Sequence, residues 1–461
     1  MQLKHPNLTL AVISLSYLML TVDLSIAVTA LPLIKSDLGF SNASLSWIQN
    51  AYTLTFGGLL LLGSRIGDIF GRRRMYIWGL AFFMLASLLV TIAPDAGSMI
   101  GARVLQGLGA AVLGPSSLAL LSTSFPDQPK RGKAMAIYGS ITGIGPTLGL
   151  VLGGWIASAW DWRWAFLINV PVGIVLMFAS RAYLNETAKQ KGAVDVWGAI
   201  FSTIGMGSIV FGLIHSAEFG WSNTITWICL GIGALAVFAF IKTEQKVEKP
   251  LVPLRLFKSR QRSGANLARA LFVGSMSAYW FYTSQYLQTA KGMTPLETGL
   301  AFLPMTLASF TIAFFVPRLS RKFGDGPFLA GGLITVAAGT LWLSQLTPTG
   351  NYFFEIALPM LLIGLGQGAS TIRLTSAGVS GVAPEDAGAA SGLVTMHVQL
   401  GQPFFLSILI TIAALAPTAG LTASQLIAKQ ANLALLGGGV LCLIALATVL
   451  IFVLPKKHQE D

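Results

Sequence analysis

The sequence predicts an all-α polytopic membrane protein, and three observations support this prediction. Hydrophobic residues make up 54% of the 461 residues, whereas charged residues make up only 10%, far below the roughly 25% that is usual in soluble proteins. The mean hydropathy is +0.70. The apolar residues also gather in runs of about 20, which is the length that an α-helix needs to cross a bilayer.

We predict about fourteen membrane-spanning helices from these runs. The runs cover residues 8–30, 46–66, 75–93, 97–121, 134–156, 163–183, 195–216, 224–243, 264–288, 298–318, 327–346, 353–376, 388–414 and 431–454. The first run is interpreted as a retained helix, because Leu24 to Pro32 shows no convincing signal-peptide cleavage site. Cys229 and Cys442 both fall in apolar runs, which argues against a disulfide framework.

The positions of Lys and Arg predict the topology of these helices. Most of the 30 basic residues lie in or beside the loops that follow even-numbered runs, and short basic loops stay in the cytoplasm. The exceptions are Lys35, Arg163, Lys291 and Lys429. The asymmetry predicts an even number of spans with both termini cytoplasmic. It also accounts for the net charge of +12 without a nucleic-acid partner.

A dense basic turn joins the second and third runs. It reads Ser64-Arg-Ile-Gly-Asp-Ile-Phe-Gly-Arg-Arg-Arg74, with Asp68 at the end of one span and Gly71 where the backbone turns tightly. The turn resembles the loop signature of the major facilitator superfamily, Gly-x-x-x-Asp-Arg-x-Gly-Arg-Arg, although Ser64 and Ile69 depart from it. The resemblance implies a cytoplasmic latch formed by Asp68, Gly71 and Arg72. The alternative is an ordinary positive-inside anchor, which needs only the arginines.

A weak internal repeat agrees with the architecture of that superfamily. Phe70-Gly71 recurs as Phe323-Gly324, and Gly107-Leu-Gly109 recurs at a similar offset as Gly364-Leu-Gly366. Parallel repeats about an axis along the membrane normal form the two halves of facilitator transporters. We therefore predict a six-helix bundle in residues 1–190, two extra helices and a charged linker in 191–262, and a second six-helix bundle in 263–461.

Two charged residues inside the apolar runs are candidates for proton coupling. Asp23 lies deep in the first run, and a charged group in lipid is costly enough that it should face the bundle interior. Arg103 begins Arg103-Val-Leu-Gln-Gly107, which resembles the fourth-span signature of the superfamily. Both residues lie at similar depth, so we expect them to pair. The alternatives are a structural hydrogen-bonding acid and a permanent ion pair that only fixes helix packing.

The fifth run is rich in glycine. Gly145-Pro146 followed by Gly149 resembles the antiporter signature of the superfamily's efflux branch, although Leu150 stands where a second glycine is usual. Small residues let helices approach closely, and a generic packing face is the alternative. Further matches lie in Asp161 to Gly173, Tyr286 to Gly292, Thr298 to Pro304 and Gly388 to Gly392. Together they resemble the fourteen-span drug:proton antiporter family (EmrB/QacA-like).

Polar and aromatic side chains in the runs are candidates for a substrate pocket. Aromatic faces bind flat or cationic molecules, and the ninth run contains Tyr279, Tyr282 and Tyr286. The alternative for this cluster is a lipid-facing or interfacial group. The remaining candidates are Gln49, Asn50, Tyr52 and His397, of which the histidine is more often structural. No role is assigned to Arg373.

We therefore expect a secondary active transporter that exports drug-like or lipophilic compounds, cations among them, in exchange for protons. We expect no enzyme, metal or cofactor, because no HExxH, P-loop or Cys/His cluster is present. The protein should be a monomer in the cytoplasmic membrane that contacts lipid, protons and a small-molecule substrate. The alternatives are an uptake symporter or a metabolite exporter of the same fold, a membrane-embedded enzyme and a sensor that transports nothing.

The charge asymmetry generates a test of the topology. Reporter fusions at both termini and in the linker from Lys242 to Arg262 should all report a cytoplasmic position, because short basic segments are retained inside. A fusion at either terminus that reports an outside position would contradict the predicted arrangement.

Overall fold

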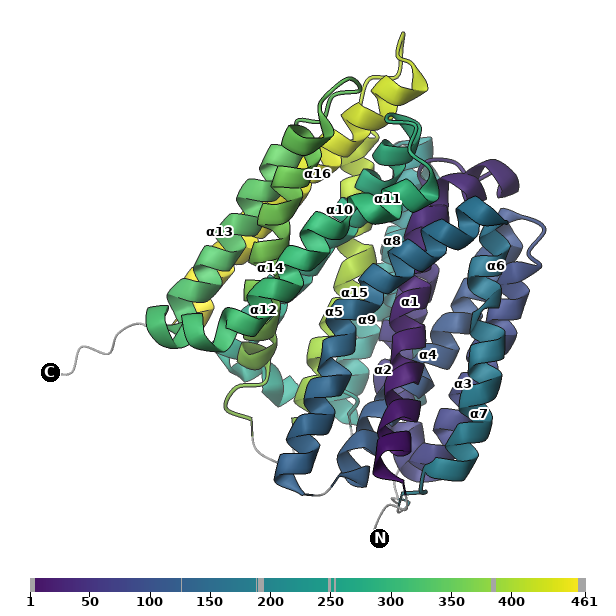
Figure 1. Ribbon diagram of the computed structural model, residues 1–461, viewed down its shortest axis with the longest axis vertical. Coiled ribbons are helices and arrows are strands. Elements are labelled where there is room, and N and C mark those ends of the chain that lie inside the picture. The colour runs from purple at the N-terminus through teal and green to yellow at the C-terminus, as the bar shows by residue number, and fades with distance from the viewer. Residues whose placement is uncertain are drawn as a thin grey trace, which may run out of the picture. The chain divides into compact units, whose positions relative to one another are not determined.

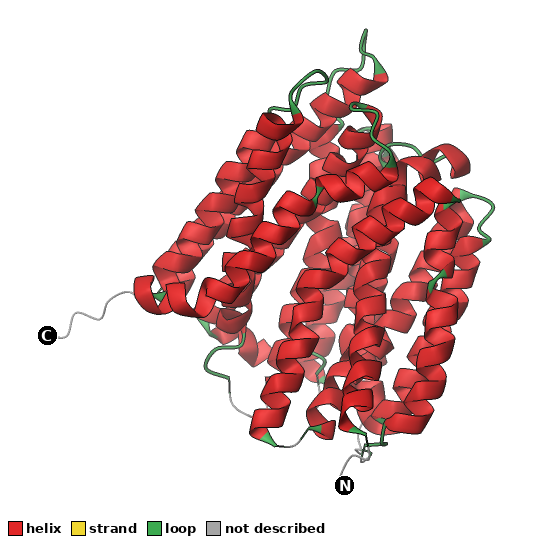
Figure 2. Ribbon diagram, in the orientation of Figure 1, coloured by secondary structure: helices red, strands yellow, loops and turns green. Residues whose placement is uncertain are grey.

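The computed structural model describes residues 5–125, 127–187, 189, 195–247, 250–252, 254–382 and 387–454. Within these residues every regular element is a helix, and no strand is present (Figure 2). A helix satisfies its backbone hydrogen bonds internally, which is the requirement that a bilayer imposes. The predicted all-α fold is confirmed.

The chain divides into two compact units. The first contains Met1–Ile204, Val247–Leu251 and Thr294–Leu300, and the second contains Gly205–Lys246, Val252–Met293 and Ala301–Asp461. The helices of the first unit are α1 (Pro6–Leu38), α2 (Trp47–Phe70), α3 (Arg72–Thr91), α4 (Ala96–Ser124), α5 (Gln128–Ala159), α6 (Trp162–Leu167) and α7 (Asn169–Tyr183), with most of α11 (Pro295–Ala301). The helix α8 (Val196–Phe219) begins in the first unit and ends in the second.

The second unit contains the remaining long helices. They are α9 (Thr224–Lys246), α10 (Arg260–Thr289), α12 (Leu303–Phe323), α13 (Asp325–Leu343), α14 (Leu358–Gly378), α15 (Ala387–Ala413) and α16 (Ala423–Thr448). The division of the chain at residues 190 and 262 stays a prediction.

Helix length and apolarity support fewer than the fourteen predicted spans in the part of the chain that the structure describes. Among the described residues, twelve helical segments are long and apolar enough to cross a membrane. The runs predicted at 134–156 and 264–288 lie in α5 and α10, which are not among the twelve. The described apolar stretch of α5 is the short Ile144–Ala159. Polar and basic side chains, Arg260 and Arg269 among them, lower the hydropathy of α10.

The same packing order occurs in both units. In the first unit α4 packs against α2 and α3, while α1 packs against α5 (Figure 1). In the second unit α14 packs against α12 and α13, while α10 packs against α15. The weak repeat in the sequence therefore has a structural counterpart in how corresponding helices pair.

Two glycine pairs show why the repeat occurs in the sequence. A Cβ on Gly107 would lie 2.5 Å from the carbonyl oxygen of Tyr52 on α2, and one on Gly109 would lie 2.8 Å from the amide nitrogen of Phe83 on α3. In the second unit a Cβ on Gly364 would lie 2.1 Å from the carbonyl oxygen of Met305 on α12. A Cβ on Gly366 would lie 2.5 Å from that of Gly332 on α13. The motif Gly-Leu-Gly thus places a central helix against two neighbours at backbone distance.

Local signals in the sequence set several helix ends. Asp95 and Ser98 form a capping box at the start of α4, and Thr422 and Gln425 form another at the start of α16. These side chains satisfy backbone N–H groups that have no partner within the helix. Gly39 ends α1 with φ of +71°, a left-handed conformation that favours glycine. Helix α1 therefore extends well past the predicted boundary at residue 30.

Candidate functional site

A fully buried ion pair joins α1 and α4 in the first unit. Arg103 Nη1 lies 2.6 Å from Asp23 Oδ2, and both side chains are 0% exposed. The sequence placed the two residues at similar depth, and the structure brings them into contact. Removing one member of such a pair leaves a buried charge without a partner, which costs about 3–5 kcal/mol.

Two amide side chains complete the surroundings of the Asp23 carboxylate. Asn169 Nδ2 donates to Oδ1 at 2.7 Å, and Gln106 Nε2 donates to the same oxygen at 3.2 Å. Gln106 also donates to Ser87 Oγ at 2.7 Å and accepts from Arg103 Nη1 at 2.6 Å. The carboxylate thus has donors on both oxygens, and the network reaches from α1 to α3, α4 and α7.

The guanidinium of Arg103 is held by the second helix as well. Its Nε donates to the carbonyl oxygen of Ile48 at 2.7 Å, and its Cζ lies 4.6 Å from the ring centroid of Tyr52. The ring of Phe166 lies 5.7 Å away on another side. Cation–π contacts of this kind stabilise a desolvated guanidinium. Arg103 Nη2 and the Tyr52 hydroxyl are buried without a hydrogen-bond partner among the described residues.

Asp23 differs from the other buried acids of the described residues by its place in the fold. Asp195 precedes the first residue of α8 and Glu244 lies near the end of α9, whereas Asp23 lies in the middle of α1. A carboxylate at such a place either stays permanently paired or exchanges its arginine for a proton. The static geometry is compatible with both, because each partner of the carboxylate among the described residues is a side-chain donor that can rotate away.

A row of glycines on α5 faces the same helix that carries Asp23. A Cβ on Gly145 would lie 2.2 Å from Thr21 Oγ1, and a Cβ on Gly149 would lie 2.6 Å from the carbonyl oxygen of Val22. Gly153 continues the row one turn later, 2.8 Å from the Cα of Ile26 by the same measure. Pro146 is half-buried within α5, which is continuous through it. The two helices therefore touch at backbone distance.

The basic turn is organised around a short ion pair. Arg72 Nη2, at the start of α3, lies 2.6 Å from Oδ1 of Asp68, which is four residues earlier near the end of α2. Arg72 also reaches Ser64 Oγ at 3.4 Å, which is the position where the family signature has glycine. Gly71 ends α2 and precedes α3 with φ of +104°, where an L side chain is strained.

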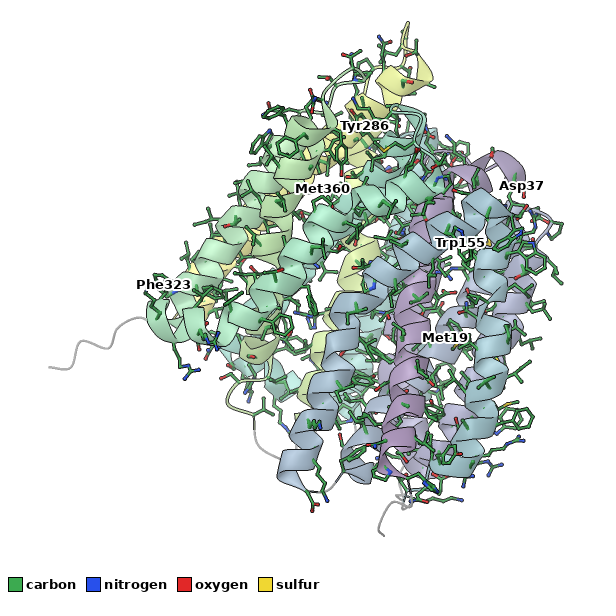
Figure 3. The ribbon with its side chains drawn as sticks, in the orientation of Figure 1. Met19, Asp37, Trp155, Tyr286, Phe323 and Met360 are labelled. Atoms are coloured by element: carbon green, nitrogen blue, oxygen red, sulfur yellow. The ribbon has the colours of Figure 1, made fainter. Side chains whose placement is uncertain are left out.

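The candidates for a substrate pocket fall into separate units. Gln49, Asn50 and Tyr52 are buried on α2 of the first unit. Tyr279, Tyr282 and Tyr286 are buried along α10 of the second, which argues against the lipid-facing alternative (Figure 3 labels Tyr286).

Specific contacts hold several of the residues in the second unit. The Tyr286 hydroxyl donates to the carbonyl oxygen of Thr347 at 2.5 Å, and the Tyr279 ring packs 5.7 Å from that of Phe302. His397 Nδ1 lies 2.8 Å from the carbonyl oxygen of Leu393 in its own helix, α15, a contact typical of a structural histidine. Arg373, which had no assigned role, forms an ion pair with Asp325 at the start of α13, with Nη1 2.9 Å from Oδ1.

Asn169 and Ser87 belong to the Asp23 network but were not among the predicted site residues. Asn169 is the first residue of α7, directly after the break at Ile168 that separates α7 from α6. Pro171 is the signal in the predicted span 163–183 for that break, because a proline has no N–H to donate to the carbonyl of Leu167. Most hydroxyls and amides in helices bond locally, so sequence alone does not single out the two that bond across helices.

Comparisons with known proteins identify the family and the fold. The sequence model of the Major Facilitator Superfamily matches residues 13–406. The cephamycin export protein CmcT of Amycolatopsis lactamdurans is 38% identical over 402 residues, covering 86% of this chain and 83% of that protein. The puromycin resistance protein pur8 of Streptomyces alboniger is 36% identical over 408 residues, covering 88% and 81%. A solved bacterial homologue of the lysosomal transporter Spinster has a TM-score of 0.68 at 14% identity, covering 98% and 97%.

The glycine row generates a test that ranks two positions. Gly149→Ala should reduce the activity of the protein in membranes more than Gly145→Ala does. The new Cβ at residue 149 would face the backbone of α1, whereas that at residue 145 would face a threonine hydroxyl that can rotate away. Overpacking of this kind costs about 1–3 kcal/mol. Gly207→Ala on α8 is the matched control, since nothing lies within 4 Å of its Cβ. Equal effects of all three substitutions would contradict close packing at Gly149.

Proposed function

The chain belongs to the Major Facilitator Superfamily, and from this premise we propose that it exports drug-like small molecules from the cell. It is a multi-pass membrane transporter and not an enzyme. Relatives that share more than a third of their residues with it are named for cephamycin export and for puromycin resistance. The glycine row on α5 supports export over uptake, because it resembles the antiporter signature of the efflux branch in part, with Leu150 in place of its second glycine.

We propose that α5 and α10 also cross the membrane, which gives the fourteen spans of the EmrB/QacA-like family. The two helices are 32 and 30 residues long. At 1.5 Å per residue each exceeds the roughly 30 Å of a hydrocarbon core. Many polar side chains of α10 are buried, Asn266, Ser275 and Thr283 among them. A helix whose polar groups face the protein interior can cross a bilayer despite its low hydropathy.

We propose proton-coupled antiport, with Asp23 as the proton carrier and Arg103 as its partner. The single observation that carries this proposal is the buried carboxylate in the middle of α1, which among the described residues is held only by side-chain donors. Protonation of Asp23 would release Arg103, and its deprotonation would recapture the guanidinium. Two arrangements of one ion pair are the kind of bistable element that couples a proton to a conformational change.

The pairing of Asp23 also bears on the substrate. Because Arg103 already neutralises the carboxylate, a substrate cation would have to displace a guanidinium to bind there. We therefore propose that neutral, aromatic or weakly charged compounds are preferred over dications. Gln49 and Asn50 on α2 are the proposed contacts in the first unit, and Tyr279 and Tyr282 on α10 are separate candidates in the second.

We further propose that the protein is a monomer in the cytoplasmic membrane with both termini inside. The asymmetry of the basic residues supports this orientation, since it places the Asp68–Arg72 turn in the cytoplasm. In that position Asp68, Gly71 and Arg72 would act as a latch for the alternating-access cycle.

A susceptibility panel tests the proposed export directly. Expression in a bacterial host that lacks its own efflux pumps should raise resistance to puromycin-like and cephalosporin-like compounds. Accumulation of such a compound inside inverted membrane vesicles should require an imposed proton gradient. Extrusion from those vesicles would indicate an uptake symporter instead.

The ion pair generates a prediction about coupling. Asp23→Asn should abolish substrate-induced proton release in proteoliposomes, and Arg103→Ala should shift its pH dependence, because each removes one half of the pair. Asp127→Asn is the matched control, since Asp127 pairs with Lys130 where both side chains are exposed. Full proton release by Asp23→Asn would show that another residue carries the proton, and His397 would be the next residue to test.

A further inference from the structure

The first backbone N–H groups of α3 have no acceptor from a capping side chain at Gly71. The helix begins at Arg72, and the preceding residue, Gly71, has no side chain with which to cap it. The first N–H groups of any helix have no intrahelical acceptor and need one from elsewhere.

Residues that follow α7 supply these acceptors from more than a hundred residues away. The Glu186 carboxylate accepts from the amide of Arg73 at 2.9 Å through Oε1 and from that of Arg74 at 3.0 Å through Oε2. Thr187 Oγ1 accepts from the amide of Arg72 at 3.2 Å. The first three amides of α3 are therefore all satisfied from one segment. A carboxylate at this end of a helix also interacts favourably with the helix dipole.

The contact is reciprocal, because α3 in turn supports the end of α7. Arg73 Nη2 donates to the carbonyl oxygen of Arg181 at 2.5 Å, and Thr9 Oγ1 on α1 donates to that of Tyr183 at 2.9 Å. Both carbonyls lie in the last turn of α7, where carbonyl groups lack intrahelical partners. We call the bonds between residues 72–74 and residues 181–187 the α3–α7 clasp, which the Thr9 bond from α1 adjoins.

Gly71 has a second role in the clasp. A Cβ on this residue would lie 2.7 Å from the carboxyl carbon of Glu186 and 2.7 Å from its Oε1. Only glycine leaves room for the carboxylate to reach the amides. The signature glycine of the basic turn therefore both permits the turn and admits the cap.

We propose that Glu186 and Thr187 are positioning residues of the transport cycle that complete the basic turn. Asp68 lies in the last turn of α2, and Arg72 is the first residue of α3. Their 2.6 Å ion pair therefore depends on where α3 begins. The clasp fixes that point and ties it to α7. It makes the start of α3 and the end of α7 move together as alternating access proceeds.

This inference rests on the proposed export function, and a readout independent of transport separates the two. The decisive variants are Glu186→Gln, which removes the charge, and Thr187→Val, which removes the acceptor at nearly constant shape. Thr187→Ser retains the hydroxyl and should restore wild-type behaviour. Asn185→Ala is the neighbouring control, because Asn185 is exposed and forms none of the hydrogen bonds that define the clasp.

Each variant is purified, reconstituted in nanodiscs and digested with trypsin, and cleavage at Arg72 to Arg74 is followed. The same variants are assayed for substrate export in proteoliposomes at matched amounts of folded protein. Glu186→Gln and Thr187→Val should increase the rate of cleavage there and lower the maximal export rate by about threefold to tenfold, the range that loss of a helix cap represents. The KM for substrate should stay within about twofold of wild type, since no pocket residue changes.

Two results would overturn the proposal. One is wild-type resistance to trypsin in both decisive variants, which would show that the clasp does not hold the start of α3. The other is faster cleavage with an unchanged maximal export rate, which would make the clasp a matter of fold stability alone. If the wild-type protein exports no test compound, the proposed function fails, and the trypsin comparison still decides whether the clasp exists.

Discussion

The first unit depends on one electrostatic constraint, which is that a charge inside a membrane helix must be neutralised by protein. Asp23 satisfies it with Arg103, Gln106 and Asn169, which come from α4 and α7. Arg103 in turn engages the backbone of α2 through Ile48, and Gln106 engages Ser87 on α3. One carboxylate therefore fixes how five helices meet. A change in its protonation would alter the contacts of all of them.

Close helix packing places that carboxylate beside a second structural feature. The glycine row on α5 contacts Thr21, Val22 and Ser25, which flank Asp23 along α1. At Gly149 the two helices lie so close that a side chain there would meet the backbone of α1. The charge network and the packing face therefore act on a single helix. Protonation of Asp23 would therefore act on α5, the helix that carries the antiporter signature, through its contacts with α1.

The sequence predicted the elements whose signals are local or strongly periodic. Apolar runs located the helices, and similar depth in the membrane predicted the contact between Asp23 and Arg103. The break at Ile168 and the extension of α1 to Leu38 were not predicted, although Pro171 and Gly39 are local signals for them, because an apolar run marks the part of a helix in the bilayer and not where the helix ends. Glu186 was missed for a related reason. It is an exposed acid in a loop. Only the fold brings it into contact with the start of α3, which lies more than a hundred residues earlier in the sequence.

The central claim is that the Asp23–Arg103 pair opens and closes as a proton carrier. The most direct measurement compares two modes of transport in proteoliposomes containing Asp23→Asn. Accumulation driven by a proton gradient requires coupling, whereas exchange of labelled for unlabelled substrate at equilibrium requires only the conformational cycle. A proton carrier predicts that Asp23→Asn loses accumulation and retains exchange. Loss of both modes in a correctly folded variant would contradict the claim and leave the pair as a permanent element of helix packing.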